Sequence, residues 1–89
     1  MTLTGTPFWV SPEICRGESY TSKTDIWSFG CVIYYLATLR RPFDAKNALE
    51  LFQMIMKGKY VPATEISNSL QHLIKSCLTV NQSYRKSAK

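Results

Sequence analysis

The sequence predicts a mainly α-helical protein, and three observations lead to this fold class. Two segments, residues 48–55 and 70–78, repeat apolar residues with the spacing of one helix face. A third segment, residues 24–39, is apolar nearly throughout and follows residues that cap helices. Gly17 and Gly58 stand where helices would end, because glycine adopts the left-handed conformation of a helix C-terminus without strain. The 89 residues suffice for one domain.

The composition is that of a globular protein, with 45% hydrophobic and 12% aromatic residues. Eleven Lys and Arg against six Asp and Glu give a net charge of +5, but the basic residues are scattered, so we expect no nucleic-acid partner. The longest apolar-rich run, around residues 31–39, is too short to span a bilayer, so we expect no membrane partner. The first residues lack the features of a signal peptide. The predicted location is intracellular and cytoplasmic, with cytoskeletal or nuclear association left open.

The residues that often build metal sites are isolated in this sequence. Cys15, Cys31 and Cys77 are odd in number, far apart and without a C-x-x-C pair, which predicts buried reduced thiols rather than disulfides or zinc ligands. The one histidine, His72, falls off the apolar stripe of its predicted helix and is expected on the surface. We therefore predict no metal site and no catalytic histidine.

The N-terminal third should be a loop, a short helical turn and a long helix. Residues 1–12 are predicted as loop, and a helical turn is expected after Pro12, since proline suits a first helical position, until Gly17 stops it. The long helix is predicted from about Thr24 to Leu39, with Ser22 and Asp25 as its capping box. Its β-branched and aromatic content leaves a strand over 31–36 as the alternative.

The predicted helix at 24–39 carries apolar residues on every face past its first turn, which is typical of a helix in the middle of a large core. Two helices with one apolar face each cannot cover it on all sides. The sequence therefore predicts that part of the structure is missing or that a partner supplies it, with a truncated gene or an internal start at Met1 as explanations. The isolated chain is expected to be molten or to aggregate.

Two amphipathic helices and a loop complete the prediction. Asn47 and Glu50 can cap the first helix, which Gly58 would end, and its apolar face comprises Ala48, Leu51, Phe52 and Ile55. Residues 59–66 are predicted as loop. The second helix would be capped by Ser67, Asn68 or Ser69, and its stripe comprises Leu70, Leu73, Ile74, Cys77 and Leu78. Another helix could begin near Tyr84.

Four pieces of the sequence, in order, resemble the lower lobe of eukaryotic protein kinases. Residues 5–13 read Gly-Thr-Pro-Phe-Trp-Val-Ser-Pro-Glu, which is similar to the end of a kinase activation segment with Ser-Pro-Glu in place of Ala-Pro-Glu. Residues 25–30, Asp-Ile-Trp-Ser-Phe-Gly, resemble the start of the long central helix, and residues 41–43, Arg-Pro-Phe, the loop after it. Arg85 stands where the family keeps an arginine at the start of its last helix.

Within the kinases, residues 38–45 and 58–60 resemble the NIMA-related group most, while Phe8-Trp9 is also found in the Ste20-like group. The resemblance implies a partial protein kinase domain over residues 1–89. Residues 1–12 would be the end of the activation segment and residues 13–89 the helical part of the C-terminal lobe, with the helices that kinases call αEF, αF, αG and αH and the start of αI.

The resemblance also implies roles for individual residues. Glu13 and Arg85 would form a buried ion pair, with Trp27 packed against the Pro12-Glu13 corner. Asp25 would anchor the catalytic loop. Thr2 aligns with a position that NIMA-related kinases phosphorylate. Thr6 matches a threonine that contacts the catalytic aspartate and lysine. The substrate-binding residues implied by the family motif are Thr6, Pro7, Phe8, Trp9 and Val10.

The motifs that carry phosphoryl transfer in kinases are absent from these 89 residues. The sequence contains no Gly-rich loop, β3 lysine, His-Arg-Asp loop or Asp-Phe-Gly motif. The resemblance thus implies a parent kinase that uses ATP and Mg²⁺ on protein Ser or Thr. This piece would be inactive alone, bind neither cofactor, and have protein substrates and the remainder of the kinase domain as partners. The alternatives are a non-catalytic kinase-like (pseudokinase) interaction module and an unrelated helical binding domain.

Overall fold

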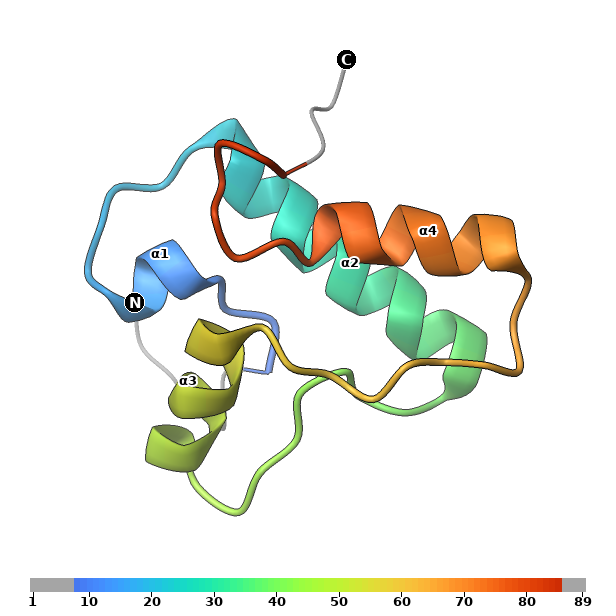
Figure 1. Ribbon diagram of the computed structural model, residues 1–89. Helices are drawn as coiled ribbons and strands as arrows, with labels where there is room; N and C mark the ends of the chain where they lie inside the picture. The colour runs from blue at the N-terminus through green and yellow to red at the C-terminus, as the bar shows by residue number, and fades with distance from the viewer. Residues whose placement is uncertain (1–7, 86–89) are drawn as a thin grey trace.

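The computed structural model describes residues 8–85, and the sequence predictions for Thr2, Thr6, Pro7 and the last four residues lie outside this range. The described chain forms four helices, α1 (Pro12–Cys15), α2 (Ser22–Thr38), α3 (Ala48–Lys57) and α4 (Asn68–Cys77), and no strand (Figure 1). The predicted mainly α-helical fold class is confirmed. The alternative of a strand over 31–36 is wrong, since these residues lie in the middle of α2.

Helix α1 is one turn, with the boundaries that its sequence predicts. Pro12 occupies the first helical turn, and Ser11 caps the helix by accepting a hydrogen bond of 3.4 Å from the backbone N–H of Ile14. Gly17 follows with a φ of +76°, a left-handed conformation that glycine adopts at little cost. The turn therefore ends where the sequence analysis placed its stop.

Helix α2 begins earlier than predicted, and its capping box is formed by other residues. The hydroxyl of Thr21, not Ser22, caps the helix, and the hydroxyl of Thr24, not the carboxylate of Asp25, accepts the return hydrogen bond from Thr21 at 3.0 Å. The sequence prediction was thus one residue off. Both frames offer a hydroxyl at the cap, and the prediction favoured the frame with an acidic third residue because acidic residues are common there.

The other helix caps follow the sequence predictions. Asn47 accepts a hydrogen bond of 2.8 Å from the backbone N–H of Glu50 at the start of α3, and Gly58 ends that helix with a φ of +68°. Ser67, one of three predicted candidates, caps α4. Residues 59–66 join the two helices as an irregular segment, as predicted.

The core lies where α2 meets α3, α4 and the loops between them. From α2 it takes Trp27, Cys31 and Tyr34, which share one helix face at spacings of four and three residues. Helix α4 crosses α2, and the segment after α4 returns to the N-terminal end of α2 (Figure 1). The remaining buried members of this core are Phe43, Leu51, Ile55, Ala63, Ile74 and Leu78.

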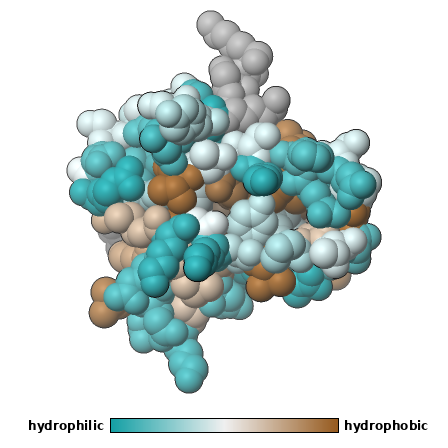
Figure 2. Space-filling view, viewed as in Figure 1, coloured by the Kyte–Doolittle hydropathy of each residue, from teal (hydrophilic) through white to brown (hydrophobic). Residues whose placement is uncertain are grey.

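The opposite face of α2 stays exposed in the described chain. Phe29 is 52% exposed and Leu36 71% exposed, and Val32 lies between them on the same side of the helix. Tyr35 and Leu39 are exposed nearby. Three helices therefore cover only part of α2, which agrees with the prediction that α2 needs more cover than its neighbours provide. By contrast, the face drawn in Figure 2 is mostly hydrophilic, with small hydrophobic patches between polar side chains.

Candidate functional site

A buried ion pair joins α1 to the end of the described chain. The guanidinium of Arg85 meets the carboxylate of Glu13 through two hydrogen bonds, from Nη1 to Oε2 at 2.8 Å and from Nη2 to Oε1 at 3.0 Å. Both side chains are fully buried, at 0% exposure. The hydroxyl of Thr24 donates a third hydrogen bond, of 2.9 Å, to Oε2 of Glu13. The two residues thus form the bidentate geometry that the resemblance implied for them.

The remaining donors of Arg85 are all used by backbone carbonyls. Its Nε donates to the carbonyl of Thr79 at 2.8 Å, Nη1 to that of Lys23 at 2.8 Å and Nη2 to that of Val80 at 3.0 Å. In return, Nζ of Lys23 donates to the carbonyl of Arg85 at 2.6 Å. This guanidinium therefore holds together α1, the start of α2 and the turn after α4, and its charge is both paired and hydrogen-bonded, as a buried charge requires.

The environment of Glu13 favours its charged form. Burial raises the pKa of this carboxyl, but hydrogen bonds from Arg85, from its own backbone N–H and from Thr24, with the charge of Arg85, outweigh the burial. The result is a pKa lowered from 4.5 to about 2. Glu13 is therefore a carboxylate throughout the physiological pH range, which suits it to a structural ion pair and not to proton transfer.

Trp27 packs beside this ion pair. The guanidinium carbon of Arg85 lies 5.1 Å from the centre of the indole ring, and the ring of Phe43 stacks on the indole at 5.5 Å with an interplanar angle of 10°. Trp27 is fully buried, and its Nε1 has no hydrogen-bond acceptor within the described chain. The indole thus connects the ion pair to the core; its expected packing against the Pro12-Glu13 corner stays a prediction.

Residues 8–10, the described part of the predicted substrate-binding segment, lie against α2. The backbone carbonyl of Trp9 accepts a hydrogen bond of 3.2 Å from the hydroxyl of Ser28. The ring of Trp9 meets that of Tyr35 edge to face, with centroids 5.9 Å apart. Phe8, Trp9 and Val10 are half-buried and pack against the core. Because α2 fixes both the backbone and the indole of Trp9, this segment has a defined surface to offer a ligand.

Asp25 lies exposed in the first turn of α2, and its carboxylate accepts a hydrogen bond from the hydroxyl of Tyr20 in the segment before the helix. It takes no part in the capping box, so the local role that its spacing suggested is wrong. Asp25 stands four residues before Phe29, on the side of α2 that carries the exposed apolar residues. Its implied role as an anchor for a catalytic loop stays a prediction.

Two residues at the site were given no site role by the sequence analysis. Thr24 donates to Glu13, and the signal that could have found it is its position three residues after Thr21, the spacing of a capping box. The guanidinium carbon of Arg41 lies 3.6 Å from the centre of the Phe8 ring. No short-range signal predicts that contact, because 33 residues separate the partners in sequence.

The described residues contain no group of three or more His, Cys, Asp and Glu side chains that could hold a metal ion. None of their helices is long and apolar enough to cross a membrane. No disulfide joins the described cysteines, and burial raises the pKa of Cys31 to about 12. His72 is exposed on α4, where the sequence analysis expected it.

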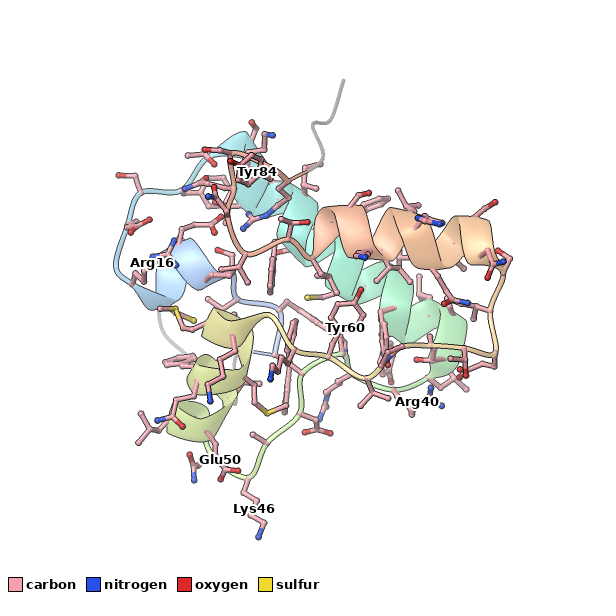
Figure 3. The ribbon with its side chains drawn as sticks, viewed as in Figure 1. Arg16, Arg40, Lys46, Glu50, Tyr60 and Tyr84 are labelled. Atoms are coloured by element: carbon pink, nitrogen blue, oxygen red, sulfur yellow. The ribbon has the colours of Figure 1, made fainter. Side chains whose placement is uncertain are left out.

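A cleft of about 520 Å³ lies between α2, α4 and the segment that joins α3 to α4. Tyr60, which is labelled in Figure 3, lies in this segment and packs edge to face on Tyr34 of α2, with ring centroids 5.8 Å apart. The hydroxyl of Tyr34 donates to the carbonyl of Val61. Its lining includes the apolar residues Pro62, Ile66 and Leu78 and the polar residues Asn68, Gln71 and Lys75. It is distinct from the segment of residues 8–10, which lies on other residues of α2.

Comparison with known proteins places these features in a family. The sequence model of the protein kinase domain matches residues 1–89. The G2-specific protein kinase nimA of Emericella nidulans is 45% identical over 85 residues, which cover 94% of this chain and 12% of that protein. The G2-specific protein kinase nim-1 of Neurospora crassa is 49% identical over 85 residues, 94% of this chain and 10% of that protein. The serine/threonine-protein kinase Nek8 of Danio rerio is 44% identical over 85 residues, which cover 94% of this chain and 12% of that protein.

The fold has a counterpart among solved structures. A crystal structure of the Rad53 kinase domain and SCD2 in complex with AMPPNP matches with a TM-score of 0.81 and 32% identity, over 91% of this chain and 34% of that one. The chain spans only about a tenth of the length of the relatives above. Fold, motifs and similarity agree: this chain belongs to the protein kinase family, and the serine/threonine kinases of the NIMA-related group are among its relatives.

Proposed function

We propose that this chain is the substrate-binding part of the C-terminal lobe of a serine/threonine protein kinase, which phosphorylates protein Ser or Thr. Residues 1–12 are then the end of the activation segment and residues 13–89 the helical part of the lobe. The observation that carries the proposal is the buried pair of Glu13 and Arg85. It fixes the segment that ends at Glu13 against α2, so that the residues before it have a defined place on the lobe.

In this proposal Phe8, Trp9 and Val10, together with Thr6 and Pro7, form the wall that receives the substrate chain. The hydrogen bond from Ser28 and the packing of Tyr35 hold that wall on α2. Preorganised binding of this kind supports phosphoryl transfer, which depends mainly on positioning. Thr2 is the proposed site of activating phosphorylation.

The remainder of the kinase domain is the proposed partner of the exposed face of α2. Phe29, Val32 and Leu36 give that face an apolar stripe, and Asp25 gives it a carboxylate at one end. Apolar residues gathered on one face indicate a surface that another element covers. Asp25 would there accept hydrogen bonds from the backbone of the catalytic loop.

ATP and Mg²⁺ are proposed to bind the rest of the kinase. The 89-residue chain alone is proposed to be inactive, because its sequence contains no Gly-rich loop, β3 lysine, His-Arg-Asp loop or Asp-Phe-Gly motif. The second candidate, a kinase-like interaction module without catalysis, is favoured by the same exposed face of α2, which suits a protein partner as well as a catalytic lobe.

The test is phosphoryl transfer by the natural full-length protein that carries this chain, with radiolabelled ATP, Mg²⁺ and Ser/Thr peptides. We expect transfer by the full-length protein, none by the isolated chain, and a strong loss in the Glu13→Ala variant. The matched control is Glu65→Ala, which breaks the exposed pair with Arg40 and should leave the rate near that of the wild type. Peptide binding without transfer by the full-length protein would support the interaction module instead.

A further inference from the structure

A cationic side chain with no role in the proposed function lies against the segment of residues 8–10. Arg41, in the loop after α2, places its guanidinium carbon 3.6 Å from the centre of the Phe8 ring. This distance is well inside the range of about 6 Å that defines a cation–π contact. The side chain of Arg41 makes no hydrogen bond or ion pair within the described residues, and the residue is exposed.

The neighbouring Arg40 differs from Arg41, because it forms an ion pair with a glutamate. Its Nη2 donates to Oε2 of Glu65 at 2.6 Å, and Figure 3 shows Arg40 at the end of α2. The two arginines are adjacent in sequence and both exposed, yet only Arg40 has an acidic partner. Arg40 therefore has its charge paired with a carboxylate of the described chain, whereas Arg41 does not.

Few carboxylates of this chain are left to pair with Arg41. The chain has six acidic residues. Glu13, Glu18 and Glu65 are paired with arginines, and Asp25 accepts the hydroxyl of Tyr20. Only Asp44 and Glu50 remain, and neither makes an ion pair within the described chain. Within the described chain no carboxylate pairs with Arg41, so its guanidinium is open to an anion of a bound molecule.

Stacking on an aromatic ring prepares a guanidinium for binding an anion. A guanidinium that lies over a ring keeps its N–H edges free to donate in its own plane, and the contact restricts its orientation before a ligand arrives. A planar fork of two N–H donors matches a carboxylate or a phosphate. Phe8 is itself held, because the next residue, Trp9, is anchored to Ser28 and Tyr35.

We infer that Arg41 is a specificity residue that binds an acidic side chain of the protein substrate, a carboxylate or a phosphorylated residue close to the phosphoacceptor. This inference rests on the proposed function, since Phe8 is part of the proposed substrate wall. It deepens that function by naming the class of substrate, a peptide with a negative charge beside the reacting Ser or Thr. Arg41 acts here in recognition and not in the transfer of the phosphoryl group.

The test measures binding of fluorescent peptides to the natural full-length protein by anisotropy. One Ser peptide in a neutral background is varied by moving a single Glu along the positions on both sides of the Ser, with Gln at the same position as the uncharged match. We expect one position at which Glu binds about tenfold more tightly than Gln, the effect of one charge-assisted contact. A phosphoserine at that position distinguishes phosphate from carboxylate recognition.

The variants are Arg41→Ala, Arg41→Lys and the control Arg40→Ala. The preference for Glu should disappear in Arg41→Ala, weaken in Arg41→Lys, which keeps the charge but loses the planar fork, and persist in Arg40→Ala. An equal affinity for Glu and Gln at every position would overturn the inference, as would a preference that survives in Arg41→Ala or is lost equally in Arg40→Ala. Arg41 is exposed, so these variants should fold.

A separate readout keeps this inference apart from the proposed kinase activity. The rate of phosphoryl transfer to the neutral parent peptide tests the proposed function alone, because that peptide carries no acid for Arg41. Transfer without any Glu preference would leave the kinase proposal standing and overturn the role of Arg41. Glu-dependent binding without phosphoryl transfer would support the role of Arg41 and overturn the kinase proposal. The same surface would then belong to a binding module.

Discussion

Gly30 of α2 faces Cys77 of α4 so closely that a Cβ at Gly30 would lie 2.5 Å from the Cβ of Cys77 and 3.1 Å from Cδ2 of Leu78. The neighbour at 2.5 Å is the first carbon of a side chain, which cannot swing away without its backbone. The two helices therefore cross where α2 has no side chain, and this position sets how closely they pack.

The first prediction follows from this contact. Gly30→Ala should lower the free energy of unfolding by about 1–3 kcal/mol, because overpacking outweighs the gain in helix propensity from alanine. Denaturant unfolding of the natural full-length protein measures the effect. Ser76→Ala, at an exposed position of α4, is the control and should change stability little. An increase in stability for Gly30→Ala would show that the helices can separate freely here.

The second prediction concerns the Glu13–Arg85 pair. Either Glu13→Ala or Arg85→Ala should cost about 3–5 kcal/mol, since each leaves a buried charge without its partner. The double variant should cost clearly less than the sum of the single variants, because the second change removes the charge that the first one stranded. A double-mutant cycle by denaturant unfolding gives the coupling. Additive costs would contradict a shared ion pair.

The matched cycle for comparison is the exposed pair of Arg40 and Glu65, whose side chains keep about half of their surface in water. Surface ion pairs of this kind are worth about 0–1 kcal/mol. We expect a coupling energy in that range for Arg40→Ala with Glu65→Ala. If both cycles gave the same coupling, burial would not be the source of the difference between the two pairs.

The third prediction is a pH dependence with a defined sign. The pKa of Glu13 is lowered from 4.5 to about 2 in the folded protein. A carboxyl with a lowered folded-state pKa stabilises the fold above its unfolded pKa and loses this contribution as the pH falls. The stability difference between wild type and Glu13→Gln should thus be constant above about pH 5 and shrink towards pH 2. A difference that grows on acidification would contradict the lowered pKa.

The fourth prediction concerns the exposed face of α2. Leu36 is 71% exposed and Phe29 52% exposed, so the isolated chain should bind the dye ANS and associate in analytical ultracentrifugation. Replacing Leu36 by Glu should reduce association without loss of helix content, because this side chain has few partners to lose. A monodisperse chain with a sharp two-state unfolding transition would contradict this expectation.

The sequence predicted the ends of a helix well where a single residue type determines where the helix begins or stops. Asn47 and Gly58 bound α3 as expected, because a side-chain acceptor and a left-handed glycine are local requirements. The start of α2 was mispredicted, since Thr21 and Ser22 can both cap a helix and each is followed three residues later by a possible capping-box partner. Thr21 also donates to Gln82, 61 residues away, at 2.9 Å, which no local pattern reports.

At the candidate site, too, some contacts could be predicted from the sequence and others could not. The pairing of Glu13 with Arg85 was available from the family resemblance, which encodes long-range contacts that periodicity does not. The contact of Arg41 with Phe8 was not, because stacking of this kind depends on where two loops meet in space. The end of α2 is a further case: Leu39 adopts a φ of +61°, a conformation that sequence rules assign to glycine or asparagine.

The span of the Glu13–Arg85 pair also bears on how this fold is made. The partners are 72 positions apart, so bringing them together costs on the order of 4 kcal/mol of chain entropy. At a synthesis rate of 5–20 residues per second, Arg85 leaves the ribosome roughly 4–14 s after Glu13. During that interval the Glu13 carboxylate lacks its cationic partner. Docking of Arg85 is therefore a late step in the biogenesis of this fold, and it completes the attachment of α1 to the turn after α4.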